Sequence, residues 1–287
     1  MYMLELIMKP KKAERKPWEM FFVGFFYALV SLFLVSMVFS QDTILREYSG
    51  ILVVTFTVIC SLPFMYYLIK LEEKKDLEIS SEGSLIREHY KAIKAMVWLF
   101  LGFVLAFSLV YIIFEDSAAY NFNAQIKVFC AINNPNNFDY CIKQNGINSI
   151  TGNVAKSAAI MSIFSNNIYV LVFTIIFSLA FGAGAIFVLA WNASVIAAAI
   201  GIFTKGEISH IPLGFLRYMI HGIPEIAAYF FGALAGGIIS IAVIRKDMRG
   251  DNMWKITQDS LILVMIAIAI LFLAALAEVF ITPRLFG

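Results

Sequence analysis

Long apolar runs dominate this chain, and short segments rich in polar and charged residues separate them. A helix needs about 20 mostly apolar residues to cross a bilayer. Six runs have that length, at residues 20–40, 51–69, 95–114, 168–190, 225–244 and 261–280. A seventh, 192–203, is mostly apolar but only twelve residues long, and it predicts a short span or a re-entrant segment. The pattern therefore predicts an all-α, polytopic transmembrane helical bundle of about seven spans.

Two apolar segments beside these runs predict helices at the membrane surface. Residues 156–167 are amphipathic and precede the fourth run, so we expect them in the outer interface. Residues 211–223 are too apolar for a free loop. A helix over 212–244 would exceed one bilayer thickness, and Pro224 is a natural place for it to break. The sequence thus predicts interfacial or re-entrant helices on the external side.

The basic residues define which segments face the cytoplasm. They gather in three segments, at 9–16, 70–94 and 245–255, and short loops rich in Lys and Arg are typically cytoplasmic. The second segment also carries six acidic residues between 72 and 88. It therefore predicts a solvated helical hairpin, and not a nucleic-acid partner. With 61% of residues hydrophobic, the chain leaves no room for a large soluble domain.

Counting spans from a cytoplasmic N-terminus places residues 115–157 and 205–223 outside. For 245–258 to lie inside, residues 192–203 must cross the bilayer, tilted or with local thinning. The prediction is a multi-pass cell-membrane protein with an external C-terminus. The first 93 residues form a two-span hairpin with a charged cytoplasmic extension, and residues 94–287 form a five-span unit.

The cysteines agree with this topology. Cys130 and Cys141 both fall in the predicted external loop, where oxidising conditions permit a disulfide. Closing a loop of that size stabilises a fold by roughly 3 kcal/mol in the chain-entropy model. A zinc site is not expected, because this loop contains no histidine. Cys60 lies within the second run and is expected to be a small buried hydrophobe.

Small residues recur at spacings that let helix backbones approach closely. They fit packing within one subunit, contact between copies of the chain, or a pore lining. The glycines concerned are Gly182, Gly184, Gly201, Gly232, Gly236 and Gly237.

Polar groups at membrane depth are costly, so each is a candidate functional residue. The predicted topology brings those of the second unit near the outer face. Each alone has a structural explanation, such as a helix start at Pro224 or snorkelling of Arg217. Together they can form a cluster in which Arg217 pairs with Glu225 or Glu278. The candidate polar residues are Arg217, His221, Glu225, Glu278, Asn166, Asn167 and Asn192.

Known catalytic motifs are missing from the sequence. It contains no His-Glu-x-x-His, no Gly-x-Ser-x-Gly and no phosphate-binding Gly-x-x-x-x-Gly-Lys-Ser/Thr motif. A metal site built from His210, His221 and Glu225 is the weakest of the possibilities. We expect no catalytic residue, no metal and no cofactor.

Three elements of the second unit resemble the stage II sporulation protein M family of membrane proteins. They are Ile163-Phe164-Ser165-Asn166-Asn167 with the later Trp191-Asn192-Ala193, then His221-Gly222-Ile223-Pro224-Glu225, and lastly Ala277-Glu278-Val279-Phe280-Ile281-Thr282-Pro283. Where the family is expected to have Asn-Gly, this chain has Asn192-Ala193. The resemblance covers about residues 95–287 and implies an integral membrane subunit without established enzymatic chemistry.

The expected function is therefore that of a scaffold, assembly or envelope-remodelling subunit of a membrane complex. The lipid bilayer surrounds it, and it is expected to be a homodimer or one component of a larger assembly. The alternative is a homo-oligomeric permease or channel whose polar cluster forms a vestibule near the outer face.

Overall fold

The computed structural model describes residues 10–39, 42–78, 82–114, 118, 120–133, 141, 156–181, 186–204, 207–245 and 250–286. Every regular element in these ranges is a helix. Seven of the helices are long and apolar enough to cross a membrane, as the sequence predicts. The fold is thus an all-α polytopic bundle.

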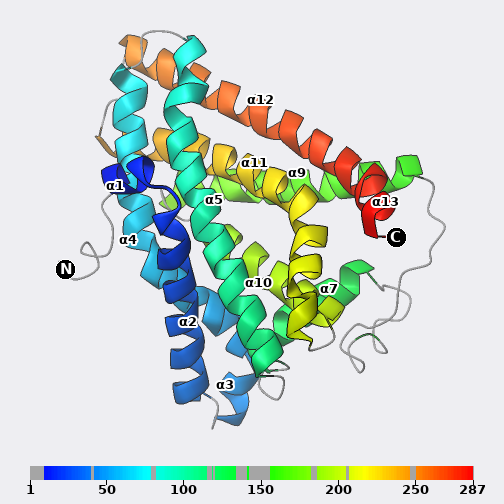
Figure 1. Cartoon of the computed structure of the whole chain (residues 1–287). Coiled ribbons are helices and arrows are strands. Elements are labelled where there is room, and N and C mark those ends of the chain that lie inside the picture. The colour runs from blue at the N-terminus through cyan, green and yellow to red at the C-terminus, as the bar shows by residue number, and fades with distance from the viewer. Residues whose placement is uncertain are drawn as a thin grey trace.

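The first part of the chain forms a hairpin of long helices. The short helix α1 (Pro10–Arg15) leads into α2 (Glu19–Phe39), and α3 (Thr43–Glu47) connects α2 to α4 (Ser49–Glu78). Helix α5 (Glu82–Ile113) returns beside α2 and α4 (Figure 1). The predicted division at residue 93 falls inside α5, which continues without a break into the second unit.

In the second part of the chain, three long helices, which are the fourth, sixth and seventh spans, pack against one another. After α7 (Asn123–Asn133) come α9 (Lys156–Phe181) and α10 (Ile186–Thr204). A short 3-10 helix, η2 (Ile208–His210), precedes α11 (Ile211–Arg245), and α12 (Gly250–Phe280) and α13 (Thr282–Phe286) end the chain. Helices α9 and α12 and the later part of α11 run across the steeper α2, α4 and α5 in Figure 1.

The boundaries of the fourth and fifth spans differ from the prediction. The fourth helix does not run to residue 190 but ends at Phe181, and α10 begins at Ile186. The fifth span therefore has 19 residues instead of twelve, and at about 1.5 Å per residue it needs no thinning of the bilayer. Between the two helices the sequence is Gly-Ala-Gly-Ala, and glycine is a poor helix former.

The two predicted interfacial segments belong to longer helices. Residues 156–167 form the first half of α9 and do not stand apart from it. Residues 211–223 join the sixth span in α11, a single helix of 35 residues that contains Pro224. Figure 1 shows α11 changing direction along its length, which a proline inside a helix explains because its ring disrupts the local hydrogen bonding. The chain therefore bends at this region without a break between two helices.

The charged hairpin formed by α4 and α5 is helical, as predicted, but it is not wholly solvated. Glu72, Glu73 and His89 are fully buried. Nδ1 of His89 lies 2.7 Å from Oε2 of Glu72. Nζ of Lys75 lies 2.7 Å from Oε1 of the same glutamate and also contacts the carboxylate of Glu14 on α1. Helix α1 is thereby attached to the adjoining ends of α4 and α5. The run of charged residues in the sequence predicted exposure to solvent, whereas in the structure acidic and basic side chains of this segment contact one another.

Candidate functional site

Helix α11 carries its polar residues on one face. Arg217, His221, Glu225 and Tyr229 are separated by four residues each, a spacing that aligns side chains along a helix. Glu225 is near the middle of α11, because the helix begins at Ile211 and not at Pro224. The helix start predicted at Pro224 is therefore wrong.

The centre of the site is a hydrogen-bond network between α9 and α11. Asn167 donates from Nδ2 to Oε1 of Glu225 at 2.6 Å, and the hydroxyl of Tyr229 donates to Oδ1 of Asn167 at 3.0 Å. Asn167 is 6% exposed and Tyr229 only 2%. The amide of Asn167 thus serves one partner as donor and the other as acceptor. This network joins the two helices across apolar surroundings.

Helix α12 adds a second carboxylate. Glu278 is close enough to Glu225 for a Coulombic interaction, and both side chains are half-buried. Two carboxylates in one apolar region repel each other when both are ionised. The pair can accept a hydrogen bond, share a proton or attract a cation. No group of three His, Cys, Asp or Glu residues within the described ranges is arranged to hold a metal ion.

The other two predicted members of the cluster contact the C-terminal helix α13. Nδ1 of His221 lies 3.3 Å from the hydroxyl of Thr282. Arg217 donates to the carbonyl oxygen of Phe286 at 3.4 Å, and its guanidinium lies 5.1 Å from the ring centroid of Phe203. Among the described residues Arg217 makes no ion pair with Glu225 or Glu278. The hypothesis of such a pair is therefore not supported.

Two of the predicted amides lie in a different place. Asn166 points away from Asn167 on α9 and lines a groove with Asn192 of α10, whose Nδ2 donates to the carbonyl of Val188 at 2.7 Å. The groove has a volume of ≈ 620 Å³, and its other walls are mostly apolar and aromatic. Asn166 is exposed. The candidate polar residues thus divide into a buried network and an open groove.

Four of the predicted packing glycines lie at helix contacts. A Cβ added at Gly201 would meet the Tyr111 ring at 2.1 Å, and one at Gly236 would lie 2.7 Å from the carbonyl oxygen of Ile175. A Cβ added at Gly232 would lie 2.5 Å from the Leu171 side chain, and one added at Gly237 would lie 2.6 Å from the Ile69 side chain. Gly182 and Gly184 lie outside the described residues.

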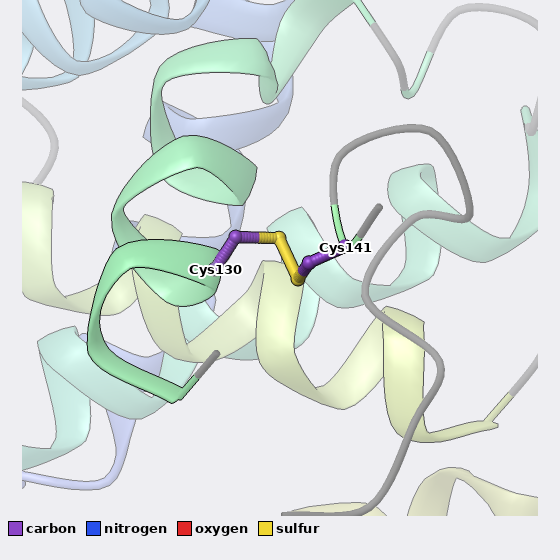
Figure 2. The surroundings of a disulfide bond; sticks show 2 residues. All are labelled: Cys130 and Cys141. Atoms are coloured by element: carbon purple, nitrogen blue, oxygen red, sulfur yellow. A yellow bond between two sulfur atoms is a disulfide. The ribbon is translucent and has the colours of Figure 1, made fainter. Parts of the chain in front are cut away.

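The predicted pair of cysteines comes together. Figure 2 shows Cys130 on α7 joined to Cys141, with an S–S distance of 2.07 Å. Both cysteines are buried, at 0% and 3% exposure. On α7, Gln125 donates from Nε2 to the carbonyl of Gly50 and to the hydroxyl of Ser194, each at 3.0 Å. Cys60 is half-buried.

Sequence reasoning did not find Tyr229, Thr282 or the buried Glu72–His89 pair. Tyr229 lies one further step of four beyond Glu225, and that spacing could have identified it. Thr282 belongs to a quoted motif but was not assigned a partner. For Glu72 and His89, the sequence shows two adjacent carboxylates near the end of one span and a histidine near the start of the next. The many other charged residues nearby made this pattern inconspicuous.

These helices and the buried polar network define a polytopic α-helical membrane protein. The family model for stage II sporulation protein M matches residues 95–283, so the chain belongs to that family. The match begins within α5 and extends to α13, and it includes every residue of the polar network. No curated protein and no solved structure matches the chain.

Proposed function

We propose that this protein is a non-enzymatic scaffold or assembly subunit of a membrane complex, and that envelope remodelling is the work of that complex. The observation that carries the proposal is the arrangement of Asn167, Glu225 and Tyr229. Their polar atoms bond to one another across two helices. Groups that must bind and release a substrate need bonding capacity that is not already used within the protein.

A network of this kind supports a scaffold in a specific way. Within a bilayer a hydrogen bond between helices selects one pairing and one register, because an unmatched polar group is costly there. The Asn167–Glu225 bond therefore holds α9 against α11 in a defined position. A rigid bundle with large apolar outer faces is suited to presenting surfaces to other membrane components.

The alternative is a permease or channel, and the proximity of Glu225 to Glu278 favours it. Two carboxylates close enough for a Coulombic interaction can attract a cation or carry a proton. This candidate requires the charge of Glu225, whereas the scaffold requires only its hydrogen bond with Asn167. The two functions therefore predict different effects of the same substitution.

The experiment is gentle extraction of the tagged protein from its native membrane, with the variants Glu225→Gln and Asn167→Leu beside it. We expect a second protein to copurify in a fixed ratio. Glu225→Gln should keep this partner, because glutamine still accepts a hydrogen bond from Asn167. Asn167→Leu should reduce the amount of partner, because it leaves Glu225 without its donor.

Reconstituted vesicles supply the opposing test. A chain that purifies alone and conducts ions or solutes, with flux abolished by Glu225→Gln, would overturn the scaffold proposal in favour of the permease. Flux that is equal in the wild type, in Glu225→Gln and in empty vesicles is the expected result.

A further inference from the structure

Helix α9 leaves one face uncovered along most of its length. The exposed positions Ser162, Asn166, Tyr169, Phe173 and Ile176 are separated by four and three residues alternately. This is the 3.5-residue spacing with which two helices pack along a shared seam. Only 17% of the most apolar part of α9 is buried, against 67% for α10. The bundle itself therefore does not use this seam.

Polar residues lie within the uncovered face at the middle of the helix. The midpoint of α9 falls between Ile168 and Tyr169, so Ser165 and Asn166 are within about 5 Å of it along the axis. Both are exposed. Asn166 makes no hydrogen bond to the part of the chain that the structure describes. If lipid covered this face, the amide of Asn166 would lie in hydrocarbon without a partner.

Other uncovered faces of the bundle are different. The exposed residues of α2 are all apolar, including Phe22, Phe33 and Met37. The described exposed residues of α12 are apolar as well, with Met265 at 66% and Leu273 at 63%. Faces of this composition are suited to lipid tails. The exposed serines and asparagine of α9 therefore distinguish it from the faces that need only lipid.

The groove between α9 and α10 borders the same face of α9. Asn166 and Asn192 line it together with Tyr169 and Phe173, and its volume is ≈ 620 Å³. Asn192 is three residues from the midpoint of α10, at Val195. Both amides are therefore near the middle of spanning helices. The occupant of the groove must offer apolar surface and a hydrogen-bonding group at that same depth.

We propose that this face is the interface of a homodimer, in which α9 of a second copy packs along the seam and brings its own Asn166 to the groove. Two copies inserted in the same orientation are related by a two-fold axis along the membrane normal. Each residue then meets the partner at its own depth. An amide offers both a donor and an acceptor, so Asn166 complements its own copy.

This interface does not depend on the proposed function, since a scaffold and a permease could both use it. A different membrane protein on the face would need a polar side chain matched to this depth. A second copy supplies one automatically. Lipid and a different protein are therefore the two competing occupants, and the experiment separates them.

The first measurement is disulfide crosslinking between copies in the native membrane. In a Cys60→Ala background, single cysteines replace Phe173 or Ile176 on the seam. Matched controls replace Met265, which is exposed on α12, and Leu171, which is buried. We expect an oxidised species of twice the monomer mass for the two seam positions and none for the controls.

Three results would overturn the proposal. Crosslinking at Met265 equal to that at Phe173 would indicate random collision. Absence of any crosslink at either seam position would assign the face to lipid. A crosslinked species of another mass would identify a different protein as the occupant.

The second measurement tests the amide. Energy transfer between labelled copies in vesicles gives the dimer dissociation constant. Asn166→Leu should raise it about 3- to 30-fold, the range that one interhelical hydrogen bond supplies. Asn166→Gln, which keeps an amide, should stay closer to the wild type. A dimer that is unaffected by Asn166→Leu would refute the role of the amide, and because the residue is exposed the variant is expected to fold.

Discussion

Two single glycines lie where helices α2 and α5 contact each other. A Cβ at Gly24 would lie 2.2 Å from the carbonyl oxygen of Leu99, and one at Gly102 would lie 2.2 Å from that of Phe21. Helices α2 and α5 therefore meet backbone to backbone. Neither glycine was predicted to pack, although each has an alanine four positions further on, Ala28 and Ala106, and that spacing could have identified them.

Substitution of Gly102 by alanine should weaken this contact. The added methyl group meets backbone atoms that cannot rotate aside, so α2 and α5 must separate. Overpacking of this kind costs about 1–3 kcal/mol. We expect a lower thermal unfolding midpoint in detergent. Gly222→Ala is the matched control, since its nearest neighbour would be at 3.7 Å, an ordinary contact distance. An equal midpoint for the two variants would contradict the argument.

Tyr229→Phe isolates one bond of the polar network. The ring and its packing remain, whereas the hydroxyl that donates to Asn167 is lost. We expect a loss of about 0.5–1.5 kcal/mol, read as a drop in the unfolding midpoint. Tyr169→Phe removes the same atom from a side chain that is 75% exposed and should change the stability of the monomer little. If both substitutions have the same effect, the network does not stabilise the bundle.

At the scale of whole elements, apolar runs predict the existence of helices better than their ends. The number of spans is correct because six runs are long, and the seventh, 192–203, was counted as a crossing from the positions of the basic segments. The boundary between α9 and α10 was placed about ten residues too late, since residues 168–203 are almost continuously apolar. The glycines at 182 and 184 were assigned to helix packing. Their tendency to end helices would have indicated the boundary.

The candidate site was partly predictable for a similar reason. Glu225, His221 and Asn167 are noticeable in sequence because polar residues are scarce in long apolar segments. The partners of each could not be predicted, because they depend on how α9, α11 and α13 pack. Glu72 and His89 show the opposite case. Burial depends on three-dimensional contacts, so a charged residue among many charged residues gives no signal of it.

The attachment of α1 to the hairpin should depend on pH. Burial, followed by the neighbouring Glu72 carboxylate, raises the pKa of Glu14 from 4.5 to about 7. A carboxyl group with a raised pKa favours the attached state when it is protonated. The contribution is complete below about pH 4.5 and is lost as the pH rises through about 7. We therefore expect hydrogen exchange at residues 10–15 to show weaker protection at pH 8 than at pH 5.

Glu14→Gln is the control for this effect. Glutamine is neutral at every pH, so the protection of α1 should no longer fall as the pH rises. The groups that face Glu14 are Lys75 and Glu72, and His89 is bonded to Glu72. A pH dependence that persists unchanged in Glu14→Gln would assign the titration to one of those residues.

At the scale of the whole molecule, the packing agrees with the topology that the charges predict. Two contacts join the connection between the first two spans to the connection that follows the third span. Both connections lie outside in the predicted topology. Arg46 of α3 lies 3.3 Å from the ring centroid of Tyr120, and Gln125 of α7 bonds to Gly50. Glu14 and the ends of α4 and α5, all predicted to be cytoplasmic, gather elsewhere. Segments assigned to the same side of the membrane therefore pack together.

This grouping leads to a test of orientation in intact cells. Cys130 and Cys141 are too buried to report on it. In a Cys60→Ala background, a cysteine at Lys127 on α7 and another at Leu285 on α13 should react with a thiol reagent that cannot cross membranes. A cysteine at Lys91 on α5 should react only after permeabilisation. All three positions are exposed, so differences reflect sidedness. Labelling of Lys91→Cys alone would invert the topology. Labelling of Lys127→Cys without Leu285→Cys would mean an odd number of crossings between α7 and α13, and one of the helices from α9 to α12 would then not span the bilayer.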